Sequence, residues 1–157
     1  MFTLHLITLG KLKETYWQEA EAEYLKRLGP YAKITIHELR EESFSEKDQP
    51  EIIKKKEAEK IMDRISKIKA DQVVILDEHG KNFSSIEFSQ TLQKLSANGS
   101  ILFIIGGPLG LDESILKIAN LKLSLSSFTF THQMARVILL EQIYRGVMIS
   151  QNRKYHY

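Results

Sequence analysis

The stretch Ile101–Leu111, which reads ILFIIGGPLGL, decides the fold that this chain can adopt. Its first half is entirely apolar and rich in isoleucine, so it predicts a buried strand over Ile101–Ile105. Gly106, Gly107 and Pro108 then end the strand, because these residue types interrupt a sheet ladder. Glycine has no Cβ, so a ligand can come close to the backbone amides of the loop. The stretch is therefore typical of a strand that opens into a ligand-binding loop at its carboxyl end.

The rest of the chain repeats this alternation of strand and helix. Apolar runs of strand-forming residues predict strands over Phe2–Leu9, Ile34–Leu39, Val73–Leu76 and Leu121–Leu125. Apolar residues at helical spacing predict helices over Lys13–Leu28, from Pro50 to Ile68, from Ser84 to Asn98 and over Thr131–Ile149. Such alternation predicts an α/β fold, with a mostly parallel sheet and helices on both of its faces. We expect a single domain over residues 1–157.

Local signals place several boundaries. Ser84 with Glu87 has the spacing of a capping box, and Asp112 can cap a short helix after the glycine loop. The acidic and polar segment Arg40–Gln49 is expected to be a mobile loop.

Three loops follow the carboxyl ends of the expected strands. They are Asp77–Phe83, Gly106–Leu111 and Ser126–Thr131. If the three strands are neighbours in the sheet, these loops form one rim, and we expect the functional site there.

Composition excludes several classes of protein. Hydrophobic residues make up 43% of the 157 residues and charged residues 27%, which suits a globular domain with a real core. The chain has no cysteine, which removes disulfides, thiolate metal sites and cysteine nucleophiles, and fits a reducing cytoplasm. The amino terminus reads as a strand without a signal peptide, and no apolar run approaches the roughly 20 residues that span a bilayer.

Charge is distributed unevenly along the chain. The net charge is +2, but the segment from Ser114 onward holds six basic residues and one acidic residue. It therefore carries +5, and the rest of the chain carries −3. This asymmetry indicates either a polyanionic partner or a solvated basic surface.

Common catalytic motifs do not fit the sequence. The glycine loop lacks the Lys-Ser/Thr of a phosphate-binding P-loop, and its spacing and position differ from the dinucleotide fingerprint. There is no G-x-S-x-G elbow. The five histidines do not occur at metal-ligand spacing, so we expect no metal site.

Two groups of polar residues remain as candidates. His132 and Arg136 lie four residues apart at the start of a largely apolar helix, where they are either a functional pair or caps for nearby carbonyls. The tail combines rings and cations, which suit RNA bases and phosphates unless the terminus is simply frayed. The tail residues in question are Arg153, Lys154, Tyr155 and His156.

Several short motifs follow one another from one end of the chain to the other. They are Leu9-Gly10-Lys11, Tyr24–Arg27, Leu76-Asp77 with Gly80-Lys81, Ile105–Leu111, Leu123–Leu125, Thr129–Arg136, Glu141–Arg145 and Tyr155-His156. In this order the chain resembles the ribosomal RNA large subunit methyltransferase H family, the 23S rRNA pseudouridine N3-methyltransferases of the SPOUT superfamily. One position departs from the family pattern, because Thr131 stands where proline is usual before the histidine. Threonine can serve as an N-cap there, so we expect a slightly altered loop with function retained.

The resemblance implies features that spacing alone does not supply. It implies a deep trefoil knot in the C-terminal third, a cytoplasmic homodimer with the site near its interface, and S-adenosylmethionine bound in a bent shape. The implied substrate is rRNA of the large subunit, expected within the assembled ribosome. The implied cofactor-binding residues are Leu76, Gly106, Leu125, Ser126, Ser127, Phe128, Thr129 and Phe130. A last helix this apolar is also expected to bury part of its surface against a second chain.

The same resemblance suggests roles for the remaining candidates. His132 would accept or relay the N3 proton, and Arg136 would orient a phosphate or stabilise the developing anion. Tyr155 and His156 would position the base, and Arg153 with Lys154 would contact phosphates. Two alternatives stay open at this point: a ribosome-binding factor without catalysis, and an α/β enzyme that uses another nucleotide cofactor.

Overall fold

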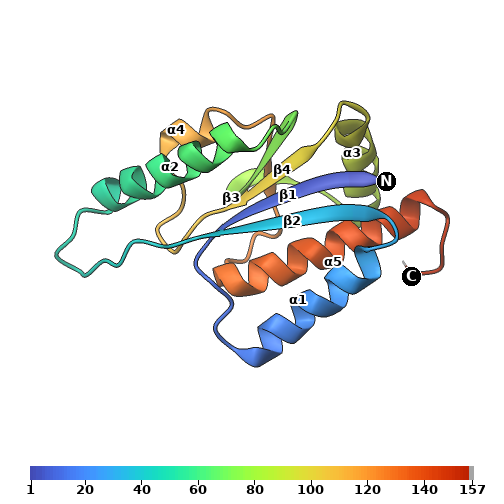
Figure 1. The fold of residues 1–157 in the computed structure, drawn as a ribbon, viewed down its shortest axis with the longest axis horizontal. Helices are drawn as coiled ribbons and strands as arrows, with labels where there is room; N and C mark the ends of the chain where they lie inside the picture. The colour runs from blue at the N-terminus through green and yellow to red at the C-terminus, as the bar shows by residue number, and fades with distance from the viewer. Residues whose placement is uncertain (156–157) are drawn as a thin grey trace.

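The computed structural model describes residues 1–155, which fold around a five-stranded sheet (Figure 1). All strand pairs are parallel, and the strand order is β2-β1-β4-β3-β5. The strands are β1 (Phe2–Leu9), β2 (Ala32–Leu39), β3 (Gln72–Asn82), β4 (Ile101–Ile105) and β5 (Leu121–Ser124). The central strand β4 is buried at every position, as its continuous apolar run predicts. The predicted parallel α/β sheet is confirmed.

Helices cover both faces of the sheet, as predicted. They are α1 (Thr15–Leu28), α2 (Pro50–Lys67), α3 (Ser85–Ala97), α4 (Glu113–Leu116) and α5 (His132–Ser150). Figure 1 shows α1, α3 and α5 on one side and α2 with α4 on the other. Each layer has its own core, with Leu28, Leu92 and Leu139 in the first and Ile61 and Ile115 in the second.

The predicted loop over Asp77–Phe83 is wrong at every residue except Phe83, because β3 continues to Asn82. Leu76 and Lys81 both pair with Leu123 of β5, so four residues bulge out of the ladder between them. Gly80 makes this possible, since a Cβ there would lie 2.6 Å from the carbonyl oxygen of Lys122. Asp77, Glu78 and His79 belong to this bulge, and Glu78 and His79 are exposed.

The predicted caps are confirmed. Ser84 and Glu87 form a complete capping box at α3, and Asp112 accepts a hydrogen bond from the backbone N–H of Ser114. The hydroxyl of Thr131 accepts from the backbone N–H of Met134 at 3.4 Å. Threonine therefore begins α5 by side-chain capping where proline would do so through its fixed backbone angle.

The helix α5 packs between α1 and α3, and none of its residues is fully exposed. Eight of its 19 residues are buried, and the others, which include Ile138 and Tyr144, keep part of their surface. The expectation that a second chain covers this surface stays a prediction. The segment Arg40–Gln49 forms no helix or strand, as predicted, and swings outward between β2 and α2 (Figure 1).

Candidate functional site

The carboxyl ends of β4, β3 and β5 meet at one edge of the sheet, because these strands are neighbours. A cavity of about 450 Å³ lies there, a volume that suits a small-molecule ligand. Seven of the eight predicted cofactor-binding residues line it, with Ser127 the exception. The seven are Leu76, Gly106, Leu125, Ser126, Phe128, Thr129 and Phe130. We call this space the cofactor cavity.

The cofactor cavity is apolar on its strand side and polar at its rim. Leu76, Ile105 and Leu123 contribute apolar surface from the three strands, and the β3 bulge adds Asp77 and Glu78. Such a mixture suits a ligand with a flat apolar part and a few hydrogen-bonding groups. In the sequence, Asp77 and Glu78 can be interpreted as acceptors for hydrogen bonds from a ribose or an amine, although the loop in isolation favours a solvated turn. Their place in the lining of the cavity favours the first interpretation.

Gly106 and Gly107, the first two of the three glycines in the loop, differ in what surrounds them. A Cβ on Gly106 would lie 2.8 Å from Cγ of Leu111, whose side chain folds back over the loop. A Cβ on Gly107 would lie 3.6 Å from both carboxylate oxygens of Glu57 on α2. The close approach of Leu111 therefore favours glycine at position 106, whereas a Cβ on Gly107 would make only an ordinary contact with Glu57.

Glu57 is an unexpected feature beneath this loop. It is only 4% exposed, and its Oε1 accepts a hydrogen bond from the backbone N–H of Glu42 at 3.1 Å. Burial raises the pKa of the Glu57 carboxyl. The burial of Glu57 could be predicted from the sequence, because Glu57 lies midway between Ile53 and Ile61 on the buried stripe of α2.

His132, at the first position of α5, lines the cofactor cavity. Its Nε2 is buried and has no hydrogen-bond partner among the described residues. Gly10 faces it, because a Cβ on Gly10 would lie 3.5 Å from Nε2. A buried ring nitrogen without a partner is costly unless a ligand or substrate completes it, so His132 is the strongest candidate for a chemical role.

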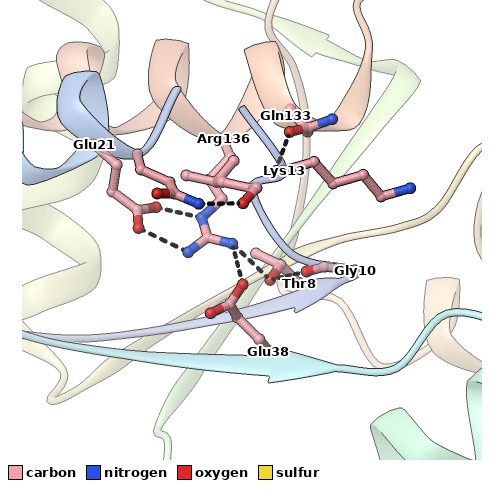
Figure 2. Close-up of polar contacts among 9 residues, drawn as sticks. Thr8, Gly10, Lys13, Glu21, Glu38, Gln133 and Arg136 are labelled. Carbon is pink, nitrogen blue, oxygen red and sulfur yellow. Dashed lines mark hydrogen bonds and ion pairs between the residues drawn. The ribbon is translucent and has the colours of Figure 1, made fainter. Parts of the chain in front are cut away.

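Arg136 lies one turn further along α5 but does not line the cofactor cavity. Its side chain is buried and is held by two acids, as Figure 2 shows. The guanidinium forms a bidentate ion pair with Glu21 of α1, and Nη1 lies 3.1 Å from Glu38 of β2 and 3.3 Å from the hydroxyl of Thr8. Both sequence interpretations, a functional pair and a cap for carbonyls, missed these carboxylates.

The tail lies at the far end of α5, away from His132. Tyr155 packs edge-on against Tyr144, with ring centroids 4.8 Å apart, and its hydroxyl donates to Glu141 at 3.4 Å. Burial raises the pKa of Tyr155 to about 12. Arg153 and Lys154 are exposed, and His156 lies outside the described residues. Within one chain the tail and the cofactor cavity are therefore not brought together.

The described residues form neither a metal cluster nor a membrane span. Among residues 1–155, no cluster of three or more His, Asp or Glu side chains is placed to hold a metal ion. In the same part of the chain, no helix is both long and apolar enough to cross a membrane.

Comparison with known proteins identifies the family to which this fold belongs. Residues 2–156 match a family described as a predicted SPOUT methyltransferase. The crystal structure of TrmJ from Z. mobilis ZM4 has a TM-score of 0.56 at 10% identity, over 93% of this chain and 70% of that one. A putative methyltransferase from Legionella pneumophila, solved with bound SAM, has a TM-score of 0.50 at 14% identity, over 93% and 66% of the two chains.

These findings define a methyltransferase of the SPOUT class, as predicted. Two relatives named Ribosomal RNA large subunit methyltransferase H are much closer in sequence. The one from Streptococcus suis is 47% identical over 98% of both chains, and the one from Clostridium acetobutylicum is 48% identical over 96% of this chain and 97% of its own. The chain belongs to the ribosomal RNA large subunit methyltransferase H family.

Proposed function

We propose that the protein transfers a methyl group from S-adenosylmethionine to N3 of a pseudouridine in 23S rRNA of the large ribosomal subunit. The observation that carries this proposal is the partnerless Nε2 of His132 at the cofactor cavity. The names of the relatives supply the class of substrate. The proposed location is the cytoplasm, where ribosomes lie.

The cofactor cavity fits S-adenosylmethionine in size and chemistry. Bound there, the molecule supplies a methyl group on a sulfonium sulfur that leaves with the electron pair of the broken carbon–sulfur bond. Leu76, Gly106 and the residues of 125–130 that line the cavity would hold it, and Ser127 is outside this set. Asp77 and Glu78 on the bulge are placed to accept hydrogen bonds from hydroxyl or ammonium groups.

His132 is proposed to take the proton that N3 must lose when it bonds to the methyl carbon. Its unpartnered Nε2 gives it a nitrogen free to accept a proton. Arg136 would be a positioning residue, because its guanidinium already forms ion pairs with Glu21 and Glu38. It would hold the first turn of α5, and with it the ring of His132, in place.

Three further parts of the proposal concern assembly. The C-terminal third would be threaded as a trefoil knot, which is consistent with residues 106–111 and 125–130 sharing one cavity. The protein would act as a homodimer, for which Phe128, 81% exposed on the cofactor loop, is a candidate contact. The tail of one subunit would then supply Tyr155, His156, Arg153 and Lys154 to the RNA at the partner's cavity.

A methylation assay on ribosomes whose 23S rRNA lacks this methyl group tests the proposal. Incubation with labelled S-adenosylmethionine should place label on 23S rRNA, at N3 of one pseudouridine. His132→Asn should retain cofactor affinity and lose transfer. Binding without any transfer would favour the ribosome-binding factor instead. A melting temperature raised by NAD and unchanged by S-adenosylhomocysteine would favour another nucleotide cofactor.

A further inference from the structure

A second and larger cavity, of about 1090 Å³, lies beside the cofactor cavity. It opens at the carboxyl ends of β1 and β2, and Pro108 of the glycine loop lines both cavities. The roles proposed above for the cofactor cavity and the tail leave this second cavity without a function. Its lining residues are Gly10, Lys11, Lys13, Glu38, Leu39, Arg40, Glu41, Glu42, Ser43, Phe44, Lys60 and Pro108.

The two cavities come close to each other near His132, the residue proposed to accept the proton. Gly10 lines the second cavity, and the space where its Cβ would stand lies 3.5 Å from Nε2 of His132, which lines the first. A side chain on Gly10 would stand between them. A substrate that occupies the second cavity therefore lies close to His132.

The charges of the second cavity leave a positive surplus. Three carboxylates line it, and each faces a cation: Glu38 pairs with Arg136 at 3.1 Å, Glu42 with Lys60 at 2.5 Å, and Glu41 lies 3.9 Å from Lys13. Lys11 and Arg40 are both exposed, and neither forms an ion pair within the described part of the chain. The lining holds four cations and three carboxylates in all, so it carries a net charge of +1, which favours an anionic occupant.

Phe44 adds a ring to this charged wall. It is 45% exposed, in the segment between β2 and α2 that forms no helix or strand. An exposed ring beside two unpaired cations combines the features that hold single-stranded nucleic acid, because bases stack on rings and phosphates meet cations.

We propose that the second cavity binds the single-stranded RNA nucleotides that flank the methylated base. Lys11 and Arg40 contact phosphates, and Phe44 stacks on a base. This inference rests on the proposed function and deepens it, since it assigns the RNA strand to the body of the subunit that also holds the methyl donor. RNA contact is then not confined to the tail.

The first test removes charge. Lys11→Ala with Arg40→Ala should weaken binding to ribosomes by about tenfold and flatten the plot of log affinity against log salt by about 1.4, the value for two phosphate contacts on a single strand. The matched control is Lys69→Ala with Lys94→Ala, which removes two exposed cations that line neither cavity. Affinity for S-adenosylhomocysteine, measured by calorimetry, should be unchanged in both.

The second test concerns the ring. Phe44→Leu should weaken ribosome binding by about tenfold, whereas Phe44→Tyr, which keeps a stacking ring, should bind normally. A photoreactive phenylalanine at position 44 should crosslink to 23S rRNA. Crosslinks to ribosomal protein alone would overturn the inference, as would a Lys11/Arg40 variant that binds with the affinity and salt dependence of the control.

The two proposals can fail separately. If the unaltered protein transfers no methyl group to ribosomes, the proposed function fails, while the salt dependence of binding still decides what the second cavity holds. If it transfers methyl groups and the Lys11/Arg40 variant does so equally well at low enzyme concentration, the proposed function stands and the RNA assignment of the second cavity is wrong.

Discussion

Arg136 on α5 and Glu21 on α1 are 115 positions apart in the chain and form a bidentate ion pair beneath the candidate site. The pair is largely withdrawn from water, since the Arg136 side chain is 4% exposed and that of Glu21 13%. Glu38 of β2 joins the same guanidinium. One buried cation thus ties two helices and a strand together, one turn from His132.

Removing Glu21 should therefore be costly. Glu21→Ala leaves the buried guanidinium with Glu38 as its remaining acid, and we expect the free energy of unfolding to fall by about 3 kcal/mol. Urea unfolding measures this. Glu23→Ala is the control. Glu23 lies two residues after Glu21 on α1 and forms an exposed ion pair with Arg27. Equal stability of the two variants would show that Glu38 alone satisfies Arg136.

Features set by local chemistry could be predicted from the sequence. The caps at Ser84, Asp112 and Thr131 depend on residues two or three positions away, and all three are confirmed. The strand ends that surround the cofactor cavity follow from the alternation of strand and helix. Local pattern sufficed here because each signal and the structure it specifies lie in one segment.

Features set by distant segments could not be predicted in this way. The β3 bulge depends on the close approach of Gly80 to Lys122, and the partners of Arg136 come from α1 and β2. Glu57 meets Gly107 only after α2 packs beneath the glycine loop. Spacing along one helix can mark such residues as unusual, but their partners emerge only from the tertiary arrangement.

Gly106 offers a test of what shapes the glycine loop. Gly106→Ala should weaken cofactor affinity, because the new Cβ would lie 2.8 Å from Cγ of Leu111 and would displace that side chain. Adding Leu111→Ala removes the clash. If affinity, measured by calorimetry, then recovers, the loop's own packing requires glycine. If it stays below the affinity of Leu111→Ala alone, which controls for the loss of Leu111 from the cavity wall, the Cβ occupies space that the ligand needs.

Glu57 should make stability depend on pH. Its folded-state pKa is raised by burial, so the folded protein binds the proton more tightly than the unfolded chain. The stability linked to this proton is fully present below the unfolded value of 4.5 and is lost as pH rises through the folded pKa. Glu57→Gln mimics the protonated acid and can still accept from Glu42.

The glutamine variant should therefore melt at a higher temperature than the parent at pH 7.5, by about 2–4 °C for each 1 kcal/mol gained in a chain of this size. The gain should shrink as pH falls toward 4.5. Thermal unfolding at several pH values measures it. A difference that stays constant with pH would contradict a proton-linked origin.

The proposed homodimer places Phe128 at a contact. Sedimentation should find a dimer at micromolar concentration, and Phe128→Ser should shift it toward monomer because a large apolar side chain leaves the interface. Ile86→Ser is the control, since Ile86 is also an exposed apolar residue, 49% exposed, and lies on α3 away from the cofactor loop. A monomer for the unaltered protein would count against any site shared between subunits.

The tail should contribute separately to stability and to RNA binding. Deleting residues 153–157 removes the edge-on contact between Tyr155 and Tyr144, and should lower the free energy of unfolding by about 1 kcal/mol. Cofactor affinity should hold, because the cavity lies at the other end of α5, about 28 Å along the helix. Methyl transfer to ribosomes should fall by orders of magnitude.

A double substitution isolates the contribution of the tail to RNA binding. Arg153→Ala with Lys154→Ala keeps Tyr155, so its melting temperature should match that of the parent. Both cations are exposed, and their loss should make ribosome binding less dependent on salt, because fewer counterions are released on binding. If this variant binds and methylates ribosomes as the parent does while the deletion fails, the tail acts through Tyr155 and the residues after it. If the deletion also methylates normally, the tail is a stabilising segment with no part in RNA recognition.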